Sequence, residues 1–117
     1  MTLQLQVVPV QRVLVVRLCG ELDHHTGRRV REAVDAALDS GQVVDVVFNL
    51  AGLSFMDSSG LGVLLGRYRR IAGHGGRLVF CSVSSSILRL MEMVGLCKLA
   101  TLYDDEQSAV ASCGVAS

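Results

Sequence analysis

Two short polar segments carry the side chains that could do chemistry in this chain. Residues 20–26 read GELDHHT, and residues 55–62 read FMDSSGLG. Serine hydroxyls near a carboxylate and a histidine can act as nucleophiles, and the same side chains can hydrogen-bond or ion-pair with a protein partner. The two segments therefore allow two classes of function, a serine hydrolase and a binding module.

A hydrolase built on Ser58 would lack its usual local motif. Residues 56–60 read MDSSG, without the first glycine of the G-x-S-x-G turn that exposes a nucleophilic serine. His24 or His25 could supply the general base, but no oxyanion-hole motif accompanies them. A phosphate-binding P-loop needs a lysine after its second glycine, and the only lysine of the chain is Lys98. A small serine hydrolase with Ser58 as nucleophile stays an alternative to a binding module.

The segment 20–26 is better explained as a helix start than as a metal site. Adjacent histidines on a helix point about 100° apart, so His24 and His25 make a poor ligand pair. Asp23 or Thr26 is expected to cap the helix that follows, with both histidines exposed. A carboxylate at Asp23 is also placed to meet an arginine of a partner. We expect no metal and no cofactor.

The segment 55–62 holds more than a helix start requires. Its capping side chains are Asp57, Ser58 and Ser59, and one of them would suffice. The glycines that follow are Gly60, Gly62 and Gly66. Each glycine costs about 1 kcal/mol relative to alanine in a helix. On the polar side of the helix these glycines would leave the backbone open to a partner, although small residues for tight packing are the simpler alternative.

The strands that position these segments follow from short, Val-rich apolar runs. We expect strands over residues 3–8, 13–19, 43–50, 77–82 and 99–103, with a turn at residues 9–11 after the first. The second and third runs are apolar nearly throughout, which is typical of central strands covered on both faces.

The helices follow from apolar residues three and four apart. These positions lie within residues 30–38, 61–72 and 87–94, and a last helix is expected from an Asp104 cap with Gln107 completing a capping box. The polar side of the first helix is expected to hold Arg28, Arg31, Glu32, Asp35 and Asp39, and that of the second Arg67, Arg69 and Arg70. Strand, helix and strand in this order form parallel units with right-handed crossovers. The chain is thus predicted to be a single α/β domain over residues 1–117, with a mixed sheet of about five strands, parallel at its centre, and about four helices.

Composition excludes several classes of partner. Lys plus Arg number 11 and Asp plus Glu number 11, so binding to nucleic acid or to an anionic membrane has no net charge to drive it. No apolar stretch reaches the roughly 18 residues of a membrane span. Cys19 and Cys81 lie inside apolar runs and are expected to be small core residues of a reducing, cytoplasmic protein.

Four matching strings identify a family resemblance over essentially the whole chain. They are GELDHHT at 20–26, LSFMDSSGLGVLLGRY at 53–68, the GG-x-LV pattern at 75–79 and GL-x-K at 95–98. Together they closely resemble the anti-sigma-factor antagonist family, the STAS domain, and in particular its sporulation members. The DSSGLG core inside a long matching string is far more specific than a lone glycine motif.

This resemblance implies a regulatory protein with no catalytic activity of its own. The unphosphorylated form would bind an anti-sigma factor that is also a serine kinase, and so free a sporulation sigma factor. The kinase would phosphorylate Ser58 from ATP, and a metal-dependent serine phosphatase would restore the active form. The residues expected at the partner interface are Asp23, Asp57, Ser59, Gly60, Leu61 and Gly62. A STAS module that binds a nucleotide is a further alternative.

Elementary electrostatics agrees with such a switch. A phosphoryl group at Ser58 would add about −1.5 to −2 charge near a helix N-terminus, which attracts anions, so the domain need not unfold. A partner closing over Gly60, Leu61 and Gly62 would have to desolvate that charge, at a cost of several kcal/mol. Phosphorylation is therefore expected to lower the affinity for the partner by orders of magnitude.

Overall fold

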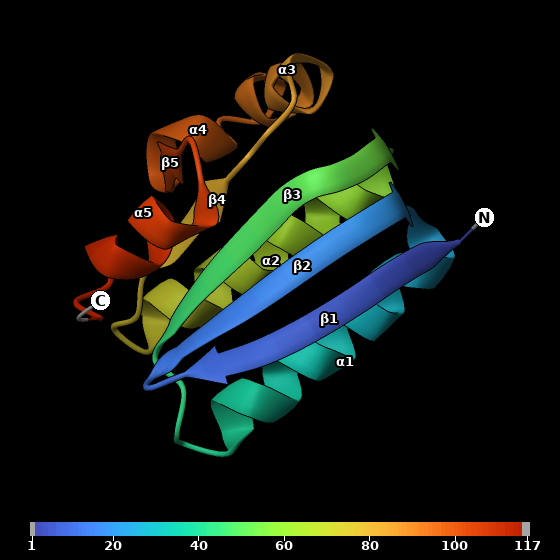
Figure 1. Cartoon of the computed structure of the whole chain (residues 1–117). Coiled ribbons are helices and arrows are strands. Elements are labelled where there is room, and N and C mark those ends of the chain that lie inside the picture. Colours follow the sequence, from blue (N-terminus) through green and yellow to red (C-terminus); the bar gives the residue numbers. More distant parts are fainter. Residues whose placement is uncertain (1, 116–117) are drawn as a thin grey trace.

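A five-stranded mixed sheet forms the centre of the computed structural model, which describes residues 2–115 (Figure 1). Its strands are β1 (Leu3–Val10), β2 (Val13–Leu22), β3 (Asp45–Met56), β4 (Leu78–Cys81) and β5 (Thr101–Tyr103). They lie in the order β1-β2-β3-β4-β5. Only β1 is antiparallel to its neighbour, while β2 to β5 pair in parallel. The predicted α/β class and the parallel centre of the sheet are confirmed.

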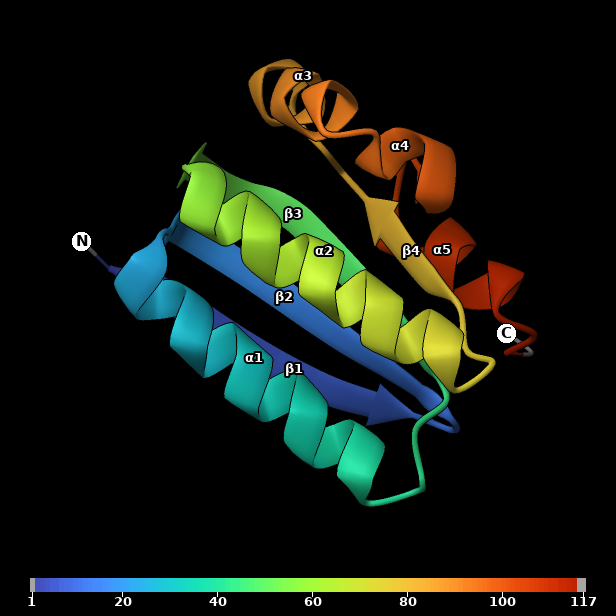
Figure 2. The same cartoon turned by 180° about the vertical axis from the view of Figure 1, so that it is seen from behind.

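The helices lie on both faces of this sheet. They are α1 (His24–Asp39), α2 (Ser58–Gly73), α3 (Ser85–Met93), α4 (Leu96–Leu99) and α5 (Glu106–Ser112). Figure 2 shows α1 and α2 side by side over one face, and Figure 1 shows α5 on the opposite face. Four of the helices were expected, whereas α4 is a single short turn that apolar periodicity does not reveal. No helix of the described residues is long and apolar enough to span a membrane.

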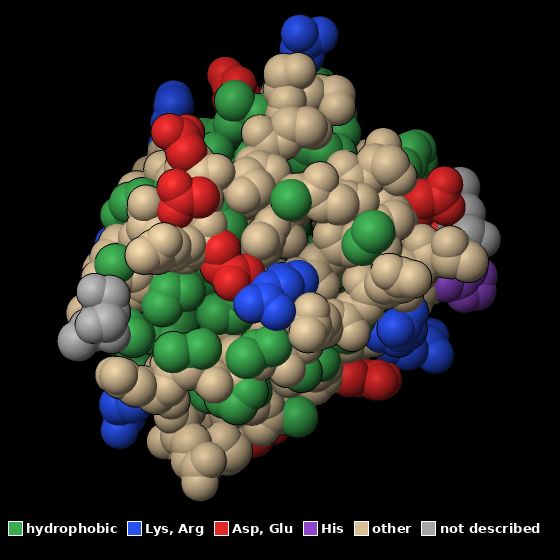
Figure 3. Space-filling model, viewed as in Figure 1, with side chains coloured by type: hydrophobic (Ala, Val, Ile, Leu, Met, Phe, Trp, Pro, Cys, Tyr) green, Lys and Arg blue, Asp and Glu red, His purple; other side chains and the backbone are tan. Residues whose placement is uncertain are grey.

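The alternation of side chains along β2 divides the core into two clusters. Leu14, Val16 and Leu18 join the larger cluster beneath α1 and α2. Val13 and Val15 point the other way and join a smaller cluster with Ala109 of α5. Because α5 is short, it covers only one end of its face, and Figure 3 shows hydrophobic side chains at the surface of this face. The prediction of strands buried on both faces holds only beneath α5.

The uncovered end of that face corrects the prediction for one cysteine. Cys81 is buried as expected, but Cys19 is exposed. Its register partner is Gly52 of β3, where a Cβ would lie 2.8 Å from the Cys19 Cβ. The two strands also extend beyond their predicted ends, β2 to Leu22 and β3 to Met56. Parallel pairing between them sustains this extension where the apolar pattern weakens.

One predicted turn and one predicted helix cap move by one or two residues. β1 continues through Pro9 and Val10, so the turn falls at Gln11, whose φ is 55°. The antiparallel edge tolerates Pro9 because an edge strand has one unpaired side. The last helix is capped by Asp105 instead of Asp104, through a hydrogen bond of 2.7 Å from Ser108 N–H to the Asp105 Oδ1.

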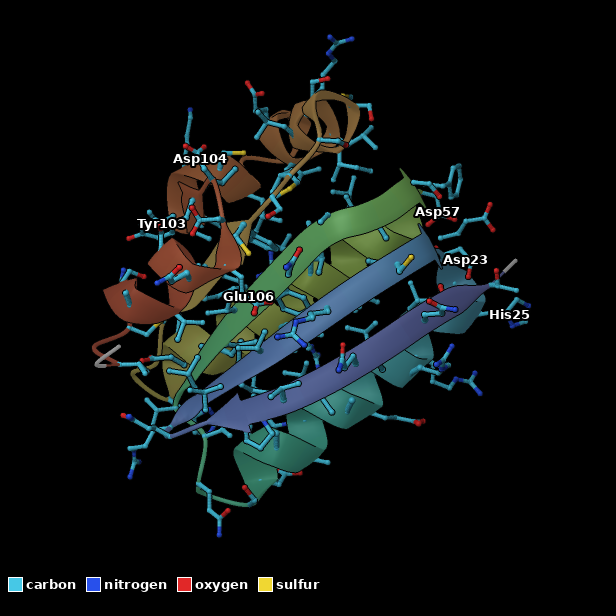
Figure 4. All side chains as sticks on the ribbon, in the orientation of Figure 1. Asp23, His25, Asp57, Tyr103, Asp104 and Glu106 are labelled. Atoms are coloured by element: carbon cyan, nitrogen blue, oxygen red, sulfur yellow. The ribbon has the colours of Figure 1, made fainter. Side chains whose placement is uncertain are left out.

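The shifted cap lets Glu106 anchor α5 to the sheet. Arg17 of β2 donates from both Nε and a terminal nitrogen to the two Glu106 oxygens, each at 2.8 Å. Asn49 of β3 donates to Glu106 Oε1 at 3.1 Å. Figure 4 shows Glu106 lying over the middle of the sheet. The ion pair with Arg17 lowers the pKa of Glu106 below its ordinary value of 4.5.

We predict that Glu106→Gln lowers the free energy of unfolding at neutral pH by about 1 kcal/mol, a modest amount because the ion pair is partly open to solvent. A carboxyl group whose folded pKa is depressed stabilises the fold above its ordinary pKa, and that contribution disappears as the pH falls through the folded value. Urea unfolding is measured at pH 7 and at stepwise lower pH. The free energy of unfolding of the wild type should approach that of the variant as the pH falls below 4.5. The exposed Glu32→Gln is the control, and a parallel pH dependence of wild type and Glu106→Gln would contradict the prediction.

Candidate functional site

The two polar segments meet because β2 and β3 end in register. Leu22 and Met56 are parallel partners at the carboxyl ends of the two strands. The next residues are Asp23 and Asp57, and Asp57 N–H donates to the Leu22 carbonyl at 3.3 Å. Figure 4 shows both aspartates at this one edge of the sheet. The edge is the place where α/β sheets commonly carry their sites.

Asp23 is the N-cap of α1. Its Oδ1 accepts hydrogen bonds of 2.9 Å from His25 N–H and from Thr26 N–H. The Asp23 N–H in turn donates to Thr26 Oγ1 at 2.9 Å, which completes a capping box. These bonds, above all that from Thr26 N–H, lower the pKa of Asp23. Asp23 is 9% exposed. Its Oδ2 has no hydrogen bond to the described residues, so Oδ2 is the oxygen that could accept the predicted hydrogen bond from an arginine of the partner.

Asp57 alone caps α2 and leaves both serines free. Its Oδ1 accepts from Gly60 N–H at 2.9 Å. Ser58 and Ser59 are the first two residues of α2, and both are exposed. Neither hydroxyl forms a hydrogen bond within residues 2–115. Ser58 thus presents an unengaged hydroxyl at the positive end of a helix dipole.

The glycines of this segment do not share one role, which corrects the sequence interpretation. Gly60 lies on the buried side of α2, where an added Cβ would be 2.5 Å from the Leu22 carbonyl oxygen. Leu61 is also buried, in the core beneath α1 and α2. Gly62 and Gly66, in contrast, have open space where a Cβ would stand. Only Gly62 and Gly66 offer the bare backbone that was predicted for all three.

Gly27 is a positioning residue that the sequence analysis missed. A Cβ on this α1 residue would lie 2.8 Å from Cγ2 of Val63 on α2. Its absence lets the two helices approach closely beside the site. A glycine inside a predicted amphipathic helix, at its buried edge, was the available signal.

A cationic groove runs between α1 and α2 next to the serines. Its volume is about 290 Å³, and its lining residues are His24, Arg28, Arg31, Ser59, Gly62, Val63 and Arg67. The sequence predicts its arginines on the polar sides of two separate helices. The arginines line one groove because α1 and α2 pack side by side over the sheet (Figure 2).

Further along the same helices the charges are paired. Arg67 binds Asp35, and Arg70 binds both Asp35, at 2.9 Å, and Asp39. The Arg67 and Arg70 side chains therefore tie α2 to α1, which the sequence analysis did not foresee. The arginine Nε of Arg67 is the one buried side-chain nitrogen or oxygen of the described residues without a hydrogen-bond partner.

The geometry gives the hydrolase and metal alternatives no support. The Ser58 hydroxyl has no hydrogen bond to an imidazole, and the rings of His24 and His25 face each other edge-on at 5.9 Å. The described residues contain no cluster of three His, Cys, Asp or Glu side chains that could hold a metal ion.

Comparison with known proteins places this arrangement in a family. The model of the STAS domain matches residues 4–109, and the chain belongs to the STAS domain family. Within it, the chain is 45% identical over the full length of both proteins to a Paenibacillus polymyxa protein named anti-sigma F factor antagonist. A protein of the same name from Lysinibacillus sphaericus is 41% identical over 82% of this chain and 81% of its own.

The solved structures agree with this assignment. The anti-sigma factor antagonist SpoIIAA in its unphosphorylated form shares 32% identity with a TM-score of 0.75, covering 95% of this chain and 96% of that one. The Bacillus cell fate determinant SpoIIAA in its phosphorylated form shares 32% identity with a TM-score of 0.76, covering 95% and 98%. The resemblance stated from the sequence motifs is confirmed.

We predict opposite effects of the same substitution at two neighbouring glycines. Gly60→Ala should destabilise the domain, because its Cβ would meet the Leu22 carbonyl at 2.5 Å, whereas Gly62→Ala meets nothing within 4 Å. Gly62→Ala should raise the free energy of unfolding by up to about 1 kcal/mol through helix propensity. Thermal and urea unfolding of the two variants measure this, and equal effects would contradict the assignment of Gly60 to the buried side.

Proposed function

We propose that the chain is an anti-sigma factor antagonist, a regulatory protein without catalytic activity, whose binding to its partner is switched by phosphorylation of Ser58. The observation that carries the proposal is the exposed Ser58 hydroxyl, left free because Asp57 alone caps α2. Support comes from the 45% identity to an anti-sigma F factor antagonist and from a 32% identical structure described as a phosphorylated form.

The partner in this proposal is an anti-sigma factor that is also a serine kinase. Its binding to the unphosphorylated chain would free a sporulation sigma factor, and a metal-dependent serine phosphatase would reverse the modification. All three steps would take place in the cytoplasm. The free hydroxyl of Ser58 is accessible to a kinase without local unfolding, since it is exposed on the first turn of a helix.

The partner would cover the edge where α1 and α2 begin. The residues available to it there are the exposed Ser59 and Gly62, the half-buried Asp57, and Phe55, which is 40% exposed. Asp23 offers its unengaged Oδ2. Gly60 and Leu61, also expected at the interface, lie beneath this surface and would support it without direct contact.

A phosphate on Ser58 would block this contact without damaging the fold. The dipole of α2 and the first-turn N–H groups that Asp57 leaves unengaged, those of Ser58 and Ser59, stabilise an anion at that position, so the free domain tolerates it. The carboxylate of Asp57 lies next to it in the chain and is already held by Gly60 N–H. A partner packing onto the same edge would have to remove water from a dianion, which costs more than the contact gains.

We predict that Ser58→Ala abolishes phosphate uptake from ATP and the cognate kinase while tight binding to the unmodified partner is kept. Ser59→Ala is the matched control, because it removes an equally exposed hydroxyl one residue away and should still be phosphorylated. Intact mass and peptide mapping after incubation with kinase and ATP make the measurement. Modification of Ser59 would overturn the site, and ester hydrolysis by the chain alone, lost in Ser58→Ala, would favour the hydrolase.

We predict further that Asp23→Asn weakens partner binding more than it weakens the fold. An asparagine side chain keeps an acceptor for His25 N–H and Thr26 N–H, so the cap of α1 survives. The charge that would meet an arginine of the partner is lost. Titration calorimetry with the anti-sigma factor, together with urea unfolding, separates the two effects. Unchanged affinity would remove Asp23 from the interface.

A further inference from the structure

The charges on α1 and α2 fall into two halves that behave differently. In the C-terminal halves, Asp35 and Asp39 of α1 pair with Arg67 and Arg70 of α2. In the N-terminal half of α1, Arg28 and Arg31 are exposed and form no ion pair or hydrogen bond within residues 2–115. Arg28 and Arg31 are three apart in the helix, so they project on the same side.

Helix propensity allows arginine at these two positions of α1, but the helix dipole does not favour it there. Cations are favourable near the C-terminal end of a helix and unfavourable near its N-terminal end, where the dipole is positive. α1 has no acidic residue in its first turn and no basic residue in its last. Because α2 begins at the same edge of the sheet as α1 (Figure 2), its positive end adds to the same field.

The groove beside these arginines is open and lacks an acidic lining residue. Arg28 and Arg31 contribute its unpaired positive groups, Arg67 is paired with Asp35, and Gly62 contributes backbone without a side chain. Ser59 also lines the groove, so any protein that covers Ser58 closely must also approach these guanidinium groups. Fixed positive charge therefore lies directly beside the proposed contact surface.

The geometry favours carboxylates of a protein over a small phosphate as the ligand. A compact phosphate site combines cations with free backbone N–H groups. Here His25 N–H and Thr26 N–H are taken by Asp23, and Gly60 N–H is taken by Asp57. Two guanidinium groups on successive turns, about 5–6 Å apart at their Cβ atoms, instead match separate carboxylates along an acidic segment.

We propose that Arg28 and Arg31 are a second contact of the partner interface, which binds carboxylate side chains of the anti-sigma factor that covers Ser58. The proposal rests on the function proposed above and names the chemistry of the partner. Negative Asp23 at the start of α1 and positive Arg28 and Arg31 further along the same helix give the interface a polarity. Such complementary patches set the orientation of the partner and accelerate association.

The test measures binding of the unphosphorylated chain to its cognate anti-sigma factor by stopped flow and calorimetry. Arg28→Glu/Arg31→Glu is expected to raise Kd by about 10-fold or more, chiefly through slower association. The difference from wild type should shrink between about 50 and 300 mM salt, because exposed charges are screened. Arg28→Lys/Arg31→Lys keeps the charge and should retain most of the affinity.

The control separates a local contact from a change in net charge. Arg12→Glu changes the charge as much as either single variant, Arg28→Glu or Arg31→Glu, but lies at the opposite end of β2, before Val13. Each groove variant should weaken binding several-fold more than Arg12→Glu. Equal effects of the three single variants would overturn the proposal, because they would show a general field instead of a contact.

Two further outcomes are distinguishable. If the wild-type chain binds the anti-sigma factor and Arg28→Glu/Arg31→Glu binds equally well, the groove is not part of the interface and the proposed function stands. If the wild type does not bind at all, the proposed function itself falls. A third outcome would reassign the groove to a small anion and overturn the proposal. In it, inorganic phosphate or ATP shifts the side-chain resonances of Arg28 and Arg31 saturably, while the double variant binds the anti-sigma factor with unchanged affinity.

Discussion

The parallel register of β2 and β3 is the constraint on which the rest of the site depends. Because Leu22 and Met56 pair at the ends of the two strands, the chain leaves the sheet twice at the same edge and enters α1 and α2 side by side. Each helix begins at an aspartate, and each aspartate binds the N–H groups of its own first turn. One register thus brings Asp23, Asp57 and the two serines together.

Close packing of small residues maintains this arrangement. Gly27 admits Val63 between the helices, and Gly60 lets the start of α2 approach the Leu22 carbonyl. Neither glycine touches a partner in the proposed function. Both set the distance between the backbone of α2 and its neighbours, and so fix where the Ser58 hydroxyl and the bare backbone at Gly62 face solvent.

The electrostatics of the helix pair complements this packing. The paired charges of the C-terminal halves hold α1 and α2 together, while Arg28 and Arg31, in the N-terminal half of α1, form no ion pair with the described residues. A chain with a net charge of zero can therefore present a local field of definite sign. One phosphate at Ser58 would be a large change in such a field, although it is a small change to the whole molecule.

The sequence by itself determined the α/β class, the two segments in which α1 and α2 begin and the family, because capping residues and apolar periodicity act over a few residues. Only the structure assigned the caps to Asp23 and Asp57. It did not determine which faces are covered. Cys19 is exposed because α5 is too short to reach it, and Gly60 and Gly62 differ because only one faces Leu22. The groove of Arg28, Arg31 and Arg67 arises only when two helices pack together. Periodicity describes one element at a time, whereas exposure and charge clustering are set by contacts between elements distant in the chain.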